Sequence, residues 1–170
     1  AHTMSRIDPL TGLLNRRSIL IQLGREQERS VQQDSPMAVV MVDLDHFKQI
    51  NDTWGHEAGD YVLIAAAEVL QKNVRQNDRV GRYGGEEFLL VLPGADLEGA
   101  RLLAERCRQQ LEALEVMLFD GRRLRASASM GVCCNQRERT LTPEMMLRRA
   151  DKALYVAKES GRNRVVTVDD

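Results

Sequence analysis

The sequence has little net charge, few cysteines and no long apolar run, and each shortage excludes a class of protein. The 170 residues carry a formal net charge of −1 at pH 7, so nothing indicates bulk binding of nucleic acid. No apolar stretch is long and uninterrupted enough to span a membrane. Cys107, Cys133 and Cys134 lack metal-ligand spacing, and their odd number favours a reducing cytoplasm over a disulfide framework.

The length fits one domain that can bury a substantial core. Residues 1–4 are interpreted as an expression remnant, and residues 5–170 as a single domain cut from a longer regulatory protein. We recognise no signal peptide, internal repeat or linker that would divide the chain. We therefore expect one compact cytoplasmic unit.

Apolar periodicity and turn residues predict alternating helices and strands. Residues 32–36 and 51–60 are expected to be polar connections. Consecutive hairpins mixed with crossover helices predict an α/β or α+β fold, in which helices flank a central mixed sheet. Helices are expected at 16–29, 46–50, 61–73 and 96–114 and from Pro143 to a stop at Gly161, and strands at 37–42, 80–83, 88–92, 116–119, 122–126, 127–134 and 165–168.

The most unusual stretch is an acidic glycine turn between two expected strands, formed by Gly84, Gly85, Glu86 and Glu87. Strand-like segments on both sides of a Gly-Gly pair predict a β-hairpin. Because glycine has no side chain, Gly84 and Gly85 can adopt positive φ and let a bulky ligand approach the backbone. Taken by itself, the tetrapeptide could also be a polar hairpin turn with solvated charges.

Two further acids, Asp43 and Asp45, follow the apolar strand expected at 37–42. Because side chains alternate along a strand, we expect one of them to face a cleft and the other to bind groups of the protein. For Asp45 we favour capping of the next helix. If this strand lies beside the hairpin, Asp43 and Glu86 converge. Such hard oxygen ligands suit Mg²⁺, with Mn²⁺ as the other ion considered, and carboxylate pairs of this kind support phosphoryl transfer.

Three cations are candidate partners for phosphate groups. Lys158 and Arg162 lie at the expected end of a helix, where complementarity to the helix dipole is the alternative interpretation. Lys48 lies on the expected short helix, where a solvated side chain is the alternative. Together with the acids and the Gly-Gly turn, these cations describe a palm-like site for nucleotidyl transfer.

Several long motifs resemble one family. The run from Arg82 to Phe88 resembles the signature of the GGDEF family, the diguanylate cyclases, with Glu in place of the Asp of the family name. Glu-Glu variants are also typical of active members. Residues 8–17, 43–60 and 150–163 resemble the family's opening segment, its metal and guanine segment, and its C-terminal helix and exit. The resemblance covers residues 8–166 and implies a palm-like nucleotidyl cyclase fold.

The resemblance also implies a reaction, in which two GTP molecules held by two facing domains become cyclic di-GMP and two pyrophosphates. Implied metal ligands are Asp43, Glu86 and the backbone carbonyl of Leu44, with Glu87 beside the metal or the attacking hydroxyl. Asn51 and Asp60 are implied to read guanine. The other implied substrate-binding residues are Lys48, Lys158 and Arg162 near the triphosphate, together with Phe47, Gly84 and Gly85.

Arg75 and Asp78 resemble the family's inhibitory product site, and Arg106 matches the position of a second arginine that completes it from a neighbouring surface. Taken alone, Arg75 and Asp78 would more simply be an ion pair at a helix end. For the whole chain, the alternatives to a cyclase that makes cyclic di-GMP are a non-catalytic module that binds GTP or cyclic di-GMP, and a cyclase with a mononucleotide product.

Overall fold

The computed structural model describes residues 5–136 and 140–167 of the chain. Its elements follow one another in the order that the sequence predicts. The helices are α1 (Arg16–Gln33), α2 (Phe47–Trp54), α3 (His56–Asn73), α4 (Leu97–Ala113) and α5 (Pro143–Glu159). The strands are β1 (Met37–Leu44), β2 (Arg79–Arg82), β3 (Glu87–Pro93), β4 (Val116–Met117), β5 (Arg123–Leu124), β6 (Ala128–Asn135) and β7 (Val165–Thr167).

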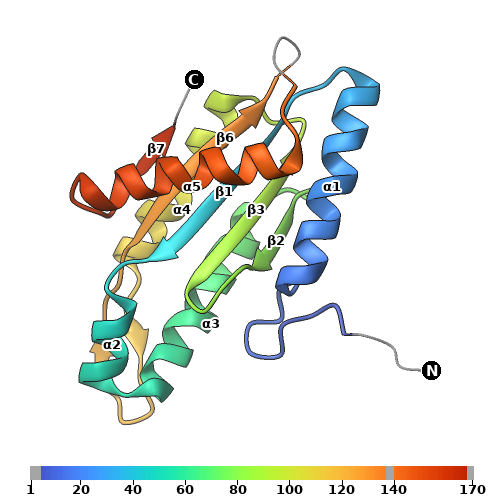
Figure 1. Ribbon diagram of the computed structural model, residues 1–170. Helices are drawn as coiled ribbons and strands as arrows, with labels where there is room; N and C mark the ends of the chain where they lie inside the picture. Colours follow the sequence, from blue (N-terminus) through green and yellow to red (C-terminus); the bar gives the residue numbers. More distant parts are fainter. Residues whose placement is uncertain (1–4, 137–139, 168–170) are drawn as a thin grey trace.

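A five-stranded mixed sheet in the order β2-β3-β1-β6-β7 forms the centre of the fold (Figure 1). The central strand β1 is antiparallel to both β3 and β6, whereas β7 runs parallel to β6. Strands β4 and β5 pair only with each other, in a small separate sheet. The mixed sheet flanked by helices confirms the predicted fold class.

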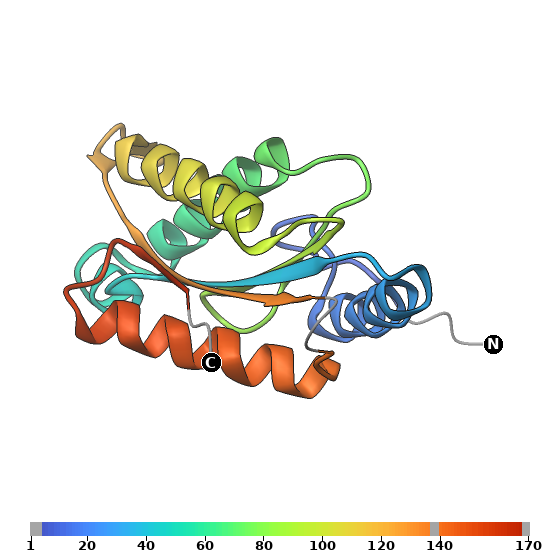
Figure 2. The ribbon, with the colours of Figure 1, turned by 90° about the horizontal axis from the view of Figure 1, so that it is seen from above.

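Helices cover both faces of this sheet, with α3 and α4 on one side and α1 and α5 on the other (Figure 2). Every residue of β1 is buried, as expected of a strand covered on both faces. Its side chains alternate: Val40 and Val42 belong to the core cluster under α3 and α4, whereas Val39 and Met41 belong to the cluster under α1 and α5. Asp43 continues the second set and therefore lies on the α5 side.

A glycine on β6 fixes how closely α5 approaches the sheet. A Cβ atom at Gly131 would lie 2.1 Å from the carbonyl oxygen of Ala150 and 2.4 Å from the backbone nitrogen of Leu154. These are backbone atoms that cannot move aside without shifting the helix. The missing side chain thus lets α5 lie directly on β6, which brings its C-terminal end to the end of β1.

The predicted polar connection at 51–60 is wrong, because most of it is helical. Helix α2 continues to Trp54, and α3 starts at His56. Gly55 alone separates them, with a φ of 95° that a residue with a side chain rarely adopts. Most of the polar residues that indicated a loop lie on the exposed faces of these two helices.

Other boundaries differ less. Helix α1 extends to Gln33, beyond the predicted end at residue 29, and Asp34 ends it in a left-handed conformation. The predicted hairpin around residues 120–121 forms, but each of its strands contains only two residues. The predicted last strand includes Val168, which lies outside the described residues. In the described parts of the chain, no helix has the length and apolar character needed to cross a membrane.

Candidate active site

Asp43 lies near the end of the central strand, where three elements meet. In the sheet it stands between Glu87 of β3 and Ser129 of β6. Its side chain is buried, and its Oδ2 accepts a hydrogen bond from Nζ of Lys158 at 2.9 Å. Lys158 therefore binds Asp43. It does not extend into solvent as a surface charge that only complements the helix dipole.

The acidic turn joins β2 to β3 directly beside Asp43. The backbone N–H of Leu44 donates to the carbonyl oxygen of Glu86 at 3.1 Å, which ties the turn to β1. The N–H groups of Tyr83 and Gly84 donate to the carbonyl oxygen of Glu87 at 2.8 and 3.2 Å. The pairing of β1 with β3 therefore places Glu87 opposite Asp43 and the backbone of Glu86 beside Leu44.

The side chain of Glu87 lies against the backbone of Gly84. A Cβ atom there would lie 2.5 Å from Oε1 of Glu87, so the glutamate folds back over the glycine backbone. Gly85 differs, since no atom lies within 4 Å of the Cβ position. A side chain at Gly85 would therefore enter open space.

Asp43 and Glu87 lie in an environment that disfavours their negative charge. Burial raises the pKa of Asp43 and, although Lys158 opposes the rise, the charges of Glu86 and Asp45 add to it. Burial also raises the pKa of Glu87, and the charges of Asp43 and Asp151 raise it further. A bound cation would relieve this repulsion, because it stabilises the ionised form of each carboxylate.

The donor set fits a hard divalent ion. Carboxylate oxygens of Asp43 and Glu86 are the ligand type that Mg²⁺ prefers, and one or two such groups suffice when substrate phosphates complete the shell. Among the described residues, no group of three or more His, Cys, Asp or Glu side chains is arranged to hold a metal ion.

Asp45 does not cap the following helix, and that prediction is wrong. Its two carboxylate oxygens accept hydrogen bonds from the hydroxyls of Ser127 and Ser129, both at 2.6 Å, and from the backbone N–H of Asn163 at 3.0 Å. The cap position of α2 is His46, which makes no side-chain capping bond. Asp45 instead links β1 to β6 and to the segment after α5, which holds the elements of the site together.

The residues implied to read guanine lie on two adjoining helices. Asn51 is on α2, and Asp60 is exposed in the first turns of α3. Phe47 starts α2 and packs against the main core, whereas Lys48 next to it is exposed. The short connection through Gly55 brings the two helices side by side, so Asn51 and Asp60 belong to one local unit.

Arg162 follows the end of α5 in a left-handed conformation, with φ of 66°. Its backbone N–H donates to the carbonyl oxygen of Ala157 at 2.9 Å, which closes the helix end. Lys158 therefore lies in the last turn of α5, and Arg162 lies just after its end. The next residue, Asn163, is held by the hydrogen bond from its backbone N–H to Asp45.

A set of contacts that the sequence did not predict braces the acidic turn. Arg82 forms an ion pair with Asp8 at 3.3 Å, and its Nη2 donates to the carbonyl oxygen of Gly85 at 2.9 Å. Arg16 donates to the carbonyl oxygen of Tyr83 at 3.1 Å and lies over its ring at 4.1 Å. These four side chains fall in motif segments, but their pairing joins positions far apart in the chain and carries no local signal.

Arg75 and Asp78 are placed together at the opposite end of β3. The side chains form an ion pair at 3.2 Å, and Oδ2 of Asp78 accepts the backbone N–H of Arg75 at 2.7 Å. The helix-end ion pair considered as the alternative is therefore present. Arg106 of α4 donates to Oδ1 of Asn73 at 3.0 Å, and Asn73 is two residues before Arg75 in the sequence.

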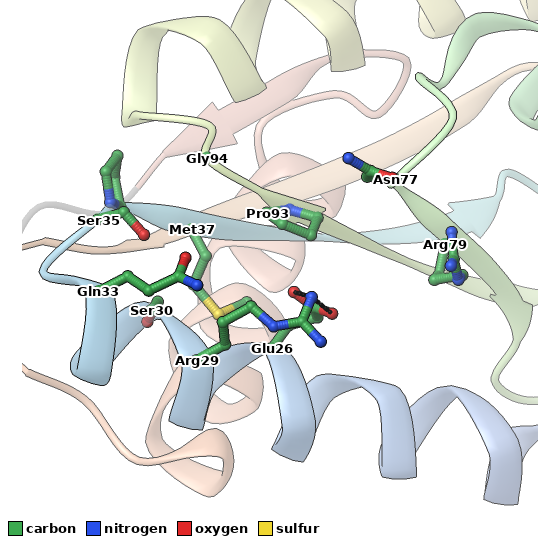
Figure 3. Close-up of a pocket in the computed structure, with 11 residues that line it drawn as sticks. Glu26, Arg29, Ser30, Gln33, Ser35, Met37, Asn77, Arg79, Pro93 and Gly94 are labelled. Carbon is green, nitrogen blue, oxygen red and sulfur yellow. Dashed lines mark hydrogen bonds and ion pairs between the residues drawn. The ribbon is translucent and has the colours of Figure 1, made fainter.

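A groove of about 410 Å³ adjoins this pair, far from the acidic site. Arg75 donates to the carbonyl oxygen of Pro93 at 2.9 Å, and Pro93 lines the groove (Figure 3). Arg29 and Arg79 line it as well, from α1 and β2. The cavity therefore extends the candidate product-site end of the molecule, not the end that contains the acids.

Known proteins match nearly the whole chain. The family model "Diguanylate cyclase, GGDEF domain" matches residues 5–164. The chain belongs to the GGDEF family. It is 41% identical over 167 residues to the probable diguanylate cyclase DgcT of Escherichia coli, covering 95% of this chain but 35% of DgcT. This GGDEF domain thus spans about a third of that curated relative.

Solved GGDEF domains share the fold across nearly the whole chain. The GGDEF domain of DgcB from Caulobacter crescentus, in complex with c-di-GMP, superposes with a TM-score of 0.91 at 28% identity, covering 98% of both chains. An active GGEEF domain of a diguanylate cyclase from Vibrio cholerae superposes with a TM-score of 0.85 at 32% identity, covering 93% of this chain and 99% of that one.

Proposed function

We propose that this GGDEF domain is a diguanylate cyclase that condenses two GTP molecules into cyclic di-GMP. In each of two steps, a 3′-hydroxyl oxygen attacks the α-phosphorus of the other GTP, and pyrophosphate leaves. The observation that carries the proposal is the meeting of Asp43, the Glu86–Glu87 turn and Lys158 at the end of β1. The Vibrio cholerae domain described as active supports the Gly-Gly-Glu-Glu form of the turn.

We propose Asp43, Glu86 and the carbonyl oxygen of Leu44 as the ligands of Mg²⁺, or of Mn²⁺ in its place. When bound, such an ion polarises phosphoryl oxygens and offsets the charge that develops during transfer. Glu87 lies beside Asp43 in the sheet and is proposed to orient the attacking hydroxyl. Its raised pKa suits a group that accepts a proton during the reaction.

The same proposal assigns roles in binding GTP. Asp60 accepts hydrogen bonds from N1–H and the exocyclic amine of guanine, two donors that adenine does not present together. Asn51 contributes the second contact to the base. Once the base covers it, an acceptor left without a donor is costly, so this arrangement rejects the wrong base. The remaining substrate contacts are proposed for Phe47, Lys48, Gly84, Gly85, Lys158 and Arg162.

One domain holds one GTP, so the reaction requires two copies of the domain facing each other. We propose a symmetric homodimer as the active unit, which is the common form of self-association. Specific activity should then rise with protein concentration, since the active unit contains two chains. A flat specific activity from a species shown to be monomeric would contradict the two-chain mechanism.

Arg75 and Asp78 are proposed as an inhibitory site for cyclic di-GMP, with Arg106 of a neighbouring domain completing it. The DgcB domain was solved with c-di-GMP, which supports product binding by relatives. In this chain Arg75 already has its guanidinium oriented by Asp78 and Pro93. We place the domain in the cytoplasm, because Cys107, Cys133 and Cys134 are all free thiols.

Incubation of the purified domain with GTP and Mg²⁺, followed by chromatography of the products, tests the proposal directly. Cyclic di-GMP and pyrophosphate in a one-to-two ratio are expected. GTP recovered intact would favour the non-catalytic binding module, and a cyclic mononucleotide would favour the other cyclase. An Asp43→Asn sample run in parallel controls for contaminating enzymes.

A further inference from the structure

The side-chain oxygen of Asn51 is buried and has no hydrogen-bond partner among the described residues. It lies against Gly59 of α3. A Cβ atom at Gly59 would be 1.9 Å from Oδ1 of Asn51, 3.0 Å from its Cγ and 3.1 Å from Cζ of Phe47. The Asn51 amide therefore occupies the space that a side chain at position 59 would fill.

Backbone conformation does not explain the glycine at this position. Gly59 is within α3 and is not among the glycines with positive φ, so any L-residue could adopt its dihedral angles. Glycine inside a helix is otherwise unfavourable compared with alanine. Gly24 of α1 is a useful contrast, because nothing lies within 4 Å of its Cβ position. The missing side chain at Gly59 leaves room for the Asn51 amide, whereas a side chain at Gly24 would meet no neighbouring atom.

That clearance is located between the two residues proposed to read guanine. Gly59 directly precedes Asp60 on α3, and Asn51 is on α2, which packs along it. A side chain at position 59 would force the Asn51 amide to rotate away or would separate α2 from α3. Either movement changes the position of Asn51 relative to Asp60.

We infer that Gly59 is a positioning residue for guanine recognition: its bare backbone seats the Asn51 amide beside Asp60. The inference rests on the proposed function, because it assumes that Asn51 and Asp60 bind the base. Gly59 acts through Asn51 and makes no contact of its own with the nucleotide. Its effect should therefore depend on the presence of the Asn51 side chain.

The test uses four proteins beside the wild type: Gly59→Ala, Gly24→Ala, Asn51→Ala and the double variant Gly59→Ala/Asn51→Ala. Calorimetric titration with a GTP analogue that resists attack at the α-phosphate measures affinity without turnover, and the matching ATP analogue measures selectivity. Thermal unfolding without nucleotide measures the steric conflict by itself.

Gly59→Ala should weaken binding of the GTP analogue by about tenfold or more, equivalent to about 1.4 kcal/mol, with weak ATP-analogue binding unchanged. Asn51→Ala should weaken GTP-analogue binding too, and the double variant should bind no more weakly than Asn51→Ala, since coupled positions are not additive. Gly59→Ala should also lower Tm, the added Asn51→Ala change should restore most of the loss, and Gly24→Ala should not lower Tm.

Unchanged GTP-analogue affinity in Gly59→Ala, or fully additive losses in the double variant, would overturn the inference. A Tm loss in Gly59→Ala that Asn51→Ala does not relieve would overturn it too, by showing that the conflict lies elsewhere. Failure of the proposed function gives a different result, namely a wild type that does not prefer the GTP analogue. The base-recognition role of Gly59 would then fall with it, while the unfolding series would still report on the contact with Asn51.

Discussion

The two ends of strands β1 and β3 carry clusters of side chains with opposite charge. At one end, Asp43 and the Glu86–Glu87 turn gather carboxylates around Lys158, and the pKa values of Asp43 and Glu87 rise. At the other end, Arg75 and its neighbours gather guanidinium groups. There the acids Asp78 and Glu26 each accept from one arginine.

The two ends also differ in the groups that their charged side chains bind. Arg75 donates to the carbonyl oxygen of Pro93, and Arg79 donates to the carbonyl oxygens of Gln76 and Asp78. These carbonyl contacts orient the guanidinium groups of Arg75 and Arg79, while Asp78 also offsets the charge of Arg75. The carboxylates at the acidic end repel one another, which suits a cation. Along the same pair of strands, the fold therefore gathers carboxylates at one end and guanidinium groups at the other.

The largest expected effect comes from removing an anionic ligand at the acidic end. Asp43→Asn or Glu86→Gln should lower the rate of cyclic di-GMP synthesis by about 10³-fold or more, because several kcal/mol of charge stabilisation depends on the metal. Product chromatography measures the rate, and circular dichroism checks the fold. Glu28→Gln, an exposed change on α1, is the matched control. Near-wild-type synthesis by either variant would refute the assignment.

A smaller effect is expected when the base reader is changed. Asp60→Ala should reduce the preference for GTP over ATP by roughly tenfold to a hundredfold, since an unpaired polar group costs about 1–3 kcal/mol. Competition binding of the two nucleotides measures the preference. Glu57→Ala changes another exposed acid in the same turn of α3 and should leave selectivity unchanged. Equal discrimination by Asp60→Ala and the wild type would exclude Asp60 as the reader.

At the arginine end, Arg75→Ala should weaken cyclic di-GMP binding by about tenfold or more, because a bidentate contact of arginine with guanine contributes about 1–3 kcal/mol. GTP turnover should persist, because Arg75 is remote from the acidic site. Calorimetric titration and turnover are measured together, with Arg101→Ala as the control for a surface arginine already paired with Glu98. Loss of both binding and turnover would mean that the Arg75–Asp78 pair is structural.

The smallest effect concerns stability. A carboxyl group whose pKa is raised by folding contributes stability that is present below its unfolded value and lost as the pH rises through its folded value. For Glu87, with an ordinary value of 4.5, its charge therefore opposes folding at neutral pH. Glu87→Gln should raise Tm at pH 7 by up to about 2 °C, a modest shift because the site is partly open to screening by water.

At pH 4 that gain should disappear, because the glutamate is then largely protonated in both states. Thermal unfolding at the two pH values measures the difference, and Glu28→Gln should show none. A Tm gain of equal size at both pH values would mean that packing, and not charge, limits stability at Glu87. Mg²⁺ should stabilise the wild type more at pH 7 than at pH 4, for the same reason.

Much of the fold could be predicted from local patterns. The apolar run at 37–42 predicted the buried central strand, and the spacing of Leu103, Ala104 and Cys107 predicted the amphipathic helix α4. The connection at 51–60 could not be predicted, because its polar residues are exposed on helices that Gly55 turns sharply. Helix α1 also ran further than predicted, to Gln33, where Asp34 in a left-handed conformation ends it.

For the site, the sequence by itself determined the chemical groups: the acids, the glycine turn and the cations occur in motifs that can be read along the chain. Tertiary structure alone decided which groups meet. Lys158 reaches Asp43 because Gly131 lets α5 lie on the sheet, Asp45 binds Ser127 and Asn163 instead of capping α2, and Arg82 joins Asp8 to the turn. The physical reason is range: propensity and periodicity act over a few residues, whereas these contacts depend on strand pairing and close packing between segments far apart in the chain.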